Sequence, residues 1–216
     1  VLGLDAGAIA RAFVVPEATL AQRLVRAKAK IRDAGIAFDV PAARDLPERL
    51  EAVLEAVYGL FSLSWDEPDP APRGDASLRA SSLRTDALEL ARAVARLLPD
   101  EPEALGLLAL ALFCEARAVA RRDDDSYAPL AAQDPARWNT PMLREADDAL
   151  TRAATLAAAR PEGLRAGRFQ LEAAIQSAHV HGALSGAQDH ESHREQVALL
   201  YEGLVALAPT LGALVG

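Results

Sequence analysis

Cysteine is nearly absent from this sequence, which has Cys114 alone among 216 residues. A single cysteine forms no internal disulfide, which excludes a small secreted scaffold held together by disulfides. No Cys and His residues with the spacing of zinc ligands surround it, which excludes a zinc finger. A reducing cytoplasm therefore suits the chain best. Cys114 shares a helical register with Leu107, Leu110 and Ala111, which predicts a small buried hydrophobe rather than a redox sensor.

Long apolar runs are lacking as well. The longest extends from Ala104 to Cys114 between two glutamates. It is far shorter than the roughly 20 residues of a membrane span, so we expect no membrane helix. The chain begins at Val1 with no basic segment ahead of an apolar one. We therefore expect no signal peptide and interpret the chain as an internal fragment.

Catalytic signatures are also missing. The sequence contains no nucleophile elbow, no phosphate-cradling glycine loop and no HExxH motif, so we expect neither an enzyme nor a cofactor. The histidines cluster at His179, His181, His190 and His193. His179 and His181 point about 200° apart on one helix, and no third ligand is fixed by the spacing. We predict exposed or half-buried histidines, with a metal on the face shared by His190 and His193 as the minor alternative.

Helical patterns dominate what is present. Hydrophobic residues make up 51% of the chain, and Ala, Leu, Arg and Glu recur with no strand-like alternation, so we predict an all-α fold without strands. The helical segments are expected at Leu46 to Phe61, Leu83 to Leu98, Glu103 to Arg121, Met142 to Ala159, Arg168 to His181 and His193 to Leu207. The loops between them are expected at Trp65 to Gly74, Asp123 to Pro141 and Gly182 to Ser192.

Proline ends several of these segments, at Pro99, Pro161 and Pro209. The intervals between the prolines, 62 and 48 residues, depart from the tetratricopeptide period of about 34. The stretch from Leu97 to Gly106 nevertheless contains the end of one helix, an acidic turn and the start of a second helix with a Leu-Gly pair. This junction is typical of tetratricopeptide repeats. The body is therefore predicted to be a degenerate helical repeat.

Charge is distributed unevenly along the chain. Up to Gly35, six basic residues outnumber three acidic ones, a net charge of +3. Since the whole chain carries −8, the remainder carries −11. This asymmetry indicates a module that binds nucleic acid, joined to an acidic body.

The basic segment from Asp5 to Arg32 has the pattern of a helix-turn-helix. A short first helix would bury Ile9, Ala10 and Phe13, with the turn at Val14 and Val15 and a second helix opened by Pro16. The apolar face of that second helix consists of Leu20, Leu24, Ala27 and Ile31. Its other face carries Thr19, Gln22, Arg23, Arg26 and Lys30, with Glu17 and Ala18 at the tip. In such an arrangement the first residues of the second helix reach bases while basic residues hold phosphates.

The combination of Ile9-Ala10, Phe13, Val15-Pro16, Thr19-Leu20, Arg23-Leu24 and Arg26-Ala27-Lys28 resembles extracytoplasmic-function RNA polymerase sigma factors. It is similar to the end of their −35 reading region, in the subgroup that carries a tetratricopeptide-like extension. The similarity continues through Leu46 to Leu50, Leu97 to Leu112, Gln133-Asp134, Arg137-Trp138 and Leu200-Tyr201. The family's polymerase-binding and −10 reading regions are not in this chain.

The resemblance implies two domains: residues 1–40 end the −35 reading helix-turn-helix, and 41–216 form a helical extension that is cut short at its C-terminus. It implies RNA polymerase core and promoter DNA as partners, and a regulatory extension that contacts a protein or peptide. The implied contacts are Glu17, Ala18, Thr19, Gln22 and Arg23 on bases and Arg26, Lys28 and Lys30 on phosphates.

Two alternatives remain at this point. The chain can instead be a helical-repeat scaffold or ligand sensor with no DNA contact of its own, and an enzyme in a loop-lined cavity is a weaker third class. Two local features are similarly open. Gln133 to Trp138 can form a binding patch or pin a long loop to the body, and we favour pinning. Asp123 to Asp125 fit a solvated loop after a helix end, with calcium binding as the minor alternative.

Overall fold

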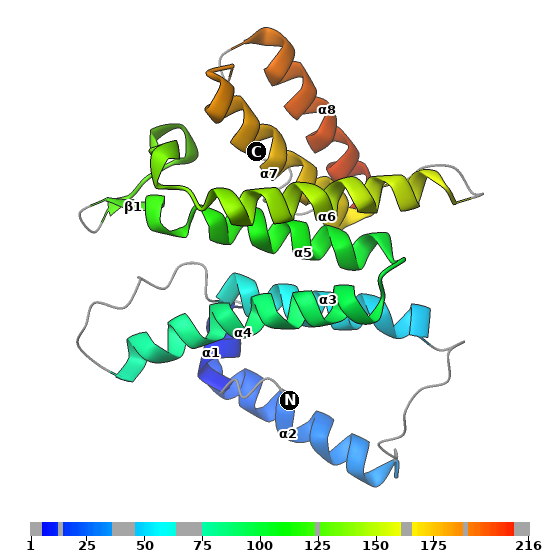
Figure 1. Ribbon diagram of the computed structural model, residues 1–216. Coiled ribbons are helices and arrows are strands. Elements are labelled where there is room, and N and C mark those ends of the chain that lie inside the picture. The colour runs from blue at the N-terminus through cyan, green and yellow to red at the C-terminus, as the bar shows by residue number, and fades with distance from the viewer. Residues whose placement is uncertain are drawn as a thin grey trace. The chain divides into compact units, whose positions relative to one another are not determined.

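A computed structural model describes residues 6–12, 15–35, 46–63, 75–123, 126–160, 166–187 and 190–209. This part of the chain is almost entirely helical, which confirms the predicted all-α fold (Figure 1). The α-helices are α1 (Ala6–Ala12), α2 (Glu17–Asp33), α3 (Leu46–Leu63), α4 (Asp75–Leu97), α5 (Pro102–Ala116), α6 (Thr140–Ala158), α7 (Arg168–Ser185) and α8 (Glu191–Leu207). Short 3-10 turns lie at η2 (Ala118–Ala120), η3 (Leu130–Ala132) and η4 (Pro135–Arg137). Within the described residues no helix is both long and apolar enough to cross a membrane.

The connections between the helices differ from the predictions in two places. The prediction of no strand is wrong at one place, because β1 (Arg122–Asp123) pairs antiparallel with β2 (Ser126–Tyr127). Strands of two residues are too short to show an alternating pattern. The predicted loop from Gly182 starts too early, since α7 continues to Ser185 and ends where Gly186 adopts a left-handed φ of 68°. The predicted loop from Trp65 to Gly74 lies outside the described residues.

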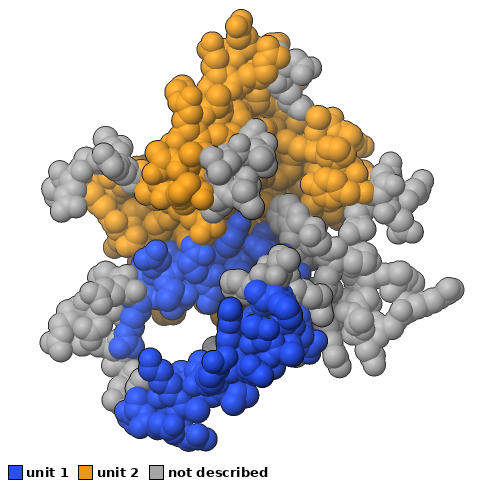
Figure 2. All heavy atoms as spheres, turned by 180° about the vertical axis from the view of Figure 1, so that it is seen from behind, with its two compact units in different colours: residues 1–87 blue, residues 88–216 orange. Residues whose placement is uncertain are grey.

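The chain divides into two compact units, residues 1–87 and 88–216, each shown in its own colour in Figure 2. The division falls inside α4, between Ala87 and Leu88. The predicted domain boundary after residue 40 lies among residues 36–45, outside the described part of the chain.

Unit 1 is built around the short helix α1, which packs against both α2 and α3. Ala10 of α1 and Leu20 of α2 are buried. Helix α3 buries one stripe, consisting of Leu54, Val57, Leu60 and Phe61. The three-to-four residue spacing of that stripe is the amphipathic pattern from which the helix was predicted.

Unit 2 is organised by α5, which packs against α6 and α7, while α8 packs against α7. Every residue from Ala104 to Cys114 is buried, because this helix is apolar on all sides and is surrounded rather than laid on a surface. Cys114 is buried with the rest, at 3% exposure, as predicted. The apolar run that was too short for a membrane is thus the central helix of a globular core.

The contact between α5 and α7 depends on Glu103, whose carboxylate caps a helix 66 residues further along. It accepts hydrogen bonds from the backbone N–H groups of Phe169 (3.0 Å) and Gln170 (3.2 Å) and from Nε2 of Gln170 (3.1 Å). A Cβ on Gly106 would lie 2.7 Å from the backbone nitrogen of Gln170, and a Cβ on Gly167 would overlap the Glu103 carboxylate. The Leu-Gly start of α5 therefore allows close approach of α7.

The loop between α5 and α6 is fastened to unit 2 by the residues that could have formed a binding patch. Nε2 of Gln133 donates to the carbonyl of Ala128 (3.0 Å), and Nη2 of Arg137 donates to the carbonyl of Val119 (2.7 Å). Gln133 and Trp138 are buried. Hydrogen bonds of Gln133 and Arg137 therefore pin the loop to the body, as predicted.

Candidate functional site

The second helix of the predicted helix-turn-helix begins as expected, directly after Pro16. Pro16 is the N-cap, with φ −57° and ψ 134°, and its carbonyl accepts hydrogen bonds from the backbone N–H groups of Thr19 and Leu20 (3.0 and 3.1 Å). The fixed φ of proline suits this position, and its missing N–H would be unpaired there in any case. The predicted buried residue Phe13 and turn residue Val14 lie outside the described residues.

The apolar face predicted for α2 is buried only in its first half. Leu20 is buried and Leu24 is half-buried, but Ala27 is exposed and Ile31 is 51% exposed. The length of α1 explains the difference, since 7 residues span about 10 Å and the 17 residues of α2 span about 26 Å. Helix α1 is thus long enough to cover only the first turns of α2.

The residues predicted to contact DNA are nearly all accessible. Thr19 is half-buried, and the exposed residues are Glu17, Ala18, Gln22, Arg23, Arg26, Lys28 and Lys30. With a turn of about 100° per residue, Arg23, Arg26 and Lys30 fall within an arc of about 60°. Lys28 lies about 160° from Arg26 around the same helix. We call the side formed by Thr19, Gln22, Arg23, Arg26 and Lys30 the basic face; Lys28 is not part of it.

The cations of α2 are not committed to carboxylates elsewhere in the described residues. Nε of Arg26 reaches only the carbonyl of Gln22 in its own helix, at 3.4 Å. Arg32 pairs with Asp33 beside it. Among the described residues, Arg23 and Lys30 have no hydrogen-bond or ion-pair partner. Unpaired guanidinium and ammonium groups in a row are suited to binding phosphate.

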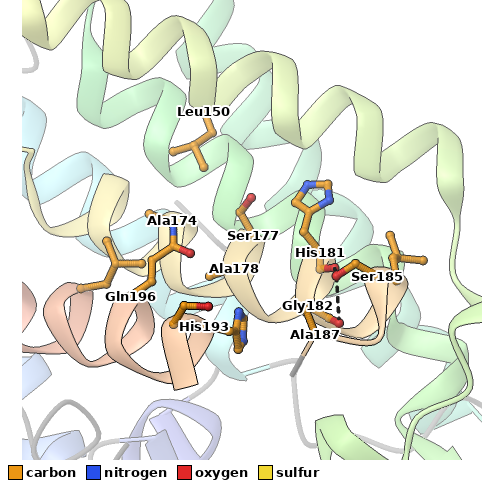
Figure 3. Close-up of a pocket in the computed structure, with 13 residues that line it drawn as sticks. Leu150, Ala174, Ser177, Ala178, His181, Gly182, Ser185, Ala187, His193 and Gln196 are labelled. Carbon is orange, nitrogen blue, oxygen red and sulfur yellow. Dashed lines mark hydrogen bonds between the residues drawn. The ribbon is translucent and has the colours of Figure 1, made fainter. Parts of the chain in front are cut away.

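Unit 2 contains a second candidate site, a cavity of about 770 Å³ among α6, α7 and α8 (Figure 3). Helix α7 supplies most of its lining and α8 faces α7, with Leu150 contributed by α6. The lining residues are Leu150, Ala174, Ser177, Ala178, His181, Gly182, Leu184, Ser185, Ala187, Ser192, His193, Gln196 and Leu200. This site was not predicted from the sequence, although the spacing of the small residues on α7 is a sequence signal.

The predicted histidine cluster is split by the fold. Nε2 of His181 hydrogen-bonds Oδ1 of Asp147 on α6 at 2.9 Å, while the rings of His179 and His193 meet edge-on at 6.3 Å. His190 is exposed at the N-cap of α8. Burial lowers the pKa of His179, and the positive neighbours His193 and Arg117 lower it further.

No group of three or more His, Cys, Asp or Glu side chains among the described residues is arranged to hold a metal ion. Of the three aspartates for which calcium binding was the minor alternative, Asp124 and Asp125 lie outside those residues.

The chain is similar to a protein family and to a relative whose descriptions name no activity. A model described as "Family of unknown function (DUF6596)" matches residues 49–154, a range that contains neither α2 nor α7 and α8. Uncharacterized protein R00370 of Rhizobium meliloti (strain 1021) is 37% identical over 211 residues, 97% of this chain and 46% of that protein. The chain thus spans about half the length of the curated relative that it matches. No solved structure matches the chain.

Proposed function

We propose that this chain is the C-terminal part of a sigma factor of the extracytoplasmic-function type, in which α2 reads the promoter −35 element. The observation that carries the proposal is the basic face of α2, whose cations are exposed and which follows the short helix α1. The family resemblance of residues 9–28 supports the same function.

The basic face fits the division of work expected of a recognition helix in the major groove. Thr19 and Gln22 lie in its first two turns, where side chains reach base edges, with Glu17 and Ala18 at the tip. Arg23, further along the same face, would also reach bases, while Arg26 and Lys30 would hold phosphates. Lys28, on another side of the helix, would meet the phosphates of the opposite strand.

The salt dependence of DNA binding tests this assignment in the full-length protein. Arg26→Ala should lower the slope of log K against log salt by about one unit, because one phosphate contact and its released counterion are lost. Arg144→Ala is the matched control, since Arg144 is exposed on α6 in unit 2 and removes the same charge. An unchanged slope in Arg26→Ala, or an equal change in both variants, would count against the contact.

We further propose that unit 2 is a regulatory interaction domain that takes the place of a separate inhibitory partner. Helical repeats commonly bind partners in this way, through the surfaces that their stacked helices form. Deletion of residues 98–216 from the full-length protein tests this role. It leaves the whole of α4 and unit 1, in which α1 packs on both α2 and α3.

Both forms would be assayed for capture of RNA polymerase core and for promoter-dependent transcription. Loss of transcription on deletion makes unit 2 a working part of initiation, and a gain makes it inhibitory. If the full-length protein captures no polymerase, the sigma-factor proposal fails.

The second candidate is a scaffold or ligand-sensing domain with no DNA contact, and the cavity in unit 2 is the observation that favours it. Under this function Arg23→Glu and Arg26→Glu would leave promoter use unchanged. Under the sigma-factor function each reversal would place a negative charge against phosphate and sharply weaken promoter binding. The same pair of variants therefore separates the two functions.

A further inference from the structure

The cavity in unit 2 lies along a row of small side chains on α7. Ala174, Ser177, Ala178 and Ser185 follow each other at helical spacing along one side of α7 and line the cavity. Gly182 lies in the same row, where a Cβ would come within 2.6 Å of Cε1 of His193 on α8. The space that remains, about 770 Å³, lies within the range of small-molecule pockets.

Polar groups in this cavity are available for a ligand. Among the described residues, the hydroxyl of Ser177, the amide of Gln196 and the imidazole of His193 make no hydrogen bond to the protein. Each of them can both donate and accept. His181 and Ser185 differ, because His181 is bonded to Asp147 and the Ser185 hydroxyl donates to the His181 carbonyl at 2.7 Å.

The cavity offers no fixed charge to a ligand. None of its described lining residues is Lys, Arg, Asp or Glu. An ionic ligand would meet no opposite charge among these residues, so the site gives it no electrostatic advantage over an uncharged one. Leu150, Leu184 and Leu200 supply aliphatic surface beside the polar groups, and an aliphatic ligand body would cover them.

We propose that the cavity among α6, α7 and α8 binds an uncharged small molecule with an amide head group and a short aliphatic body. The head group exchanges hydrogen bonds with Ser177, Gln196 and His193, since an amide both donates and accepts. The body lies against Leu150 and Leu200. This site is in unit 2 and its test involves no DNA, so its failure is separate from any failure of the DNA-binding proposal.

The test uses three probes that share a six-carbon chain and differ in the charge of the head: hexanamide, hexanoate and hexylamine. Each is titrated to about 50 mM into the full ¹⁵N-labelled chain, because ligands with so few atoms bind weakly. The titration is done at about pH 8, where histidine side chains are ordinarily neutral. We expect saturable amide shifts centred on Ser177, His193 and Gln196, with hexanamide binding at least about tenfold tighter than the two charged probes.

Variants with matched controls tie that binding to the cavity. Ala178→Leu fills the space and should raise the Kd of hexanamide at least about tenfold, while Ala198→Leu, at an exposed site on α8, should leave it within about twofold. Ser177→Ala, a change with little risk to folding, should raise the Kd about threefold or more. Ser62→Ala on α3 is its control.

Three results would overturn the proposal. The first is equal shifts with all three probes, which would indicate unspecific apolar contact. The second is no saturable shift with hexanamide. The third is an unchanged Kd in both Ala178→Leu and Ser177→Ala, which would place the binding elsewhere on the protein.

Discussion

Replacement of Glu103 by alanine should destabilise unit 2 far more than loss of a typical surface glutamate. The Glu103 carboxylate accepts three hydrogen bonds at the start of α7, two of them from backbone N–H groups of the buried residues Phe169 and Gln170. Those N–H groups belong to the first helical turn and have no partner within α7. A negative charge at this end of a helix is also favourable.

The magnitude follows from these contacts. Each buried donor left unpaired costs about 1 to 3 kcal/mol, and a charged acceptor is worth more than a neutral one. Glu103 is half-buried, so water can partly replace the carboxylate, and we expect about 3 kcal/mol in total for Glu103→Ala. In a chain of this size that loss lowers Tm by about 6 to 12 °C. Glu103→Gln keeps an acceptor and should cost about 1 kcal/mol.

Urea unfolding followed by tryptophan fluorescence measures this loss. In a Trp65→Phe background, Trp138 is the remaining tryptophan, and it is buried in unit 2. Glu195→Ala on α8, where Glu195 is exposed, should change stability by no more than about 0.5 kcal/mol. If Glu103→Ala costs as little as this control, the proposed cap of α7 is refuted.

A double-mutant cycle with Gly167 gives an independent check. A Cβ at Gly167 would overlap the Glu103 carboxylate, so Gly167→Ala should destabilise the native protein. It should destabilise the Glu103→Ala variant less, because the overlapping group has been removed. Equal costs in the two backgrounds would show that the two side chains do not meet.

Two further predictions concern groups inside unit 2. Arg92 holds Glu145 with two parallel hydrogen bonds of 2.9 and 2.8 Å. Arg92→Lys keeps the charge but loses this paired geometry, and it should cost about 1 kcal/mol in urea unfolding, whereas no loss would mean that the paired geometry contributes nothing. Burial raises the pKa of the Cys114 thiol to about 11, so a thiol reagent at about pH 8 should label it only after unfolding. Rapid labelling of the native protein would contradict the burial. Because the thiol ionises at lower pH in the unfolded chain than in the native protein, the contribution of the buried Cys114 thiol to stability should be complete below about pH 8.5 and should decline as the pH rises to about 11.

The helices could be predicted because their signal is local. Apolar residues at helical spacing and a proline at the start of α2 are properties of neighbouring residues, and the apolar spacing led to α3, α6 and α8 within about two residues of their ends. The segment predicted for α5 was wrong at its end, because it ran on to Arg121 whereas α5 ends at Ala116. The accessible basic face of α2 followed from the same periodicity. The exposure of the second half of its apolar face could not be predicted in this way, because it depends on the short length of α1 and not on the pattern of α2 itself.

Contacts between distant segments could not be predicted in this way. Gly182 and Gly186 are both local signals for a helix end, but Gly182 stays inside α7, where His193 of α8 lies against it. The cap formed by Glu103 joins residues 66 and 67 positions apart. The sequence displayed the small residues of α7, but the cavity depends on how α6 and α8 are placed beside them.

The sequence by itself therefore determined the helical class of this protein, its basic second helix and its buried cysteine. The tertiary structure decided where α7 ends, what caps it, and which polar side chains meet around a cavity. The physical reason is range: helix periodicity is set within one turn of the chain, whereas a cavity or a cross-helix cap is set by packing among segments that the sequence places far apart.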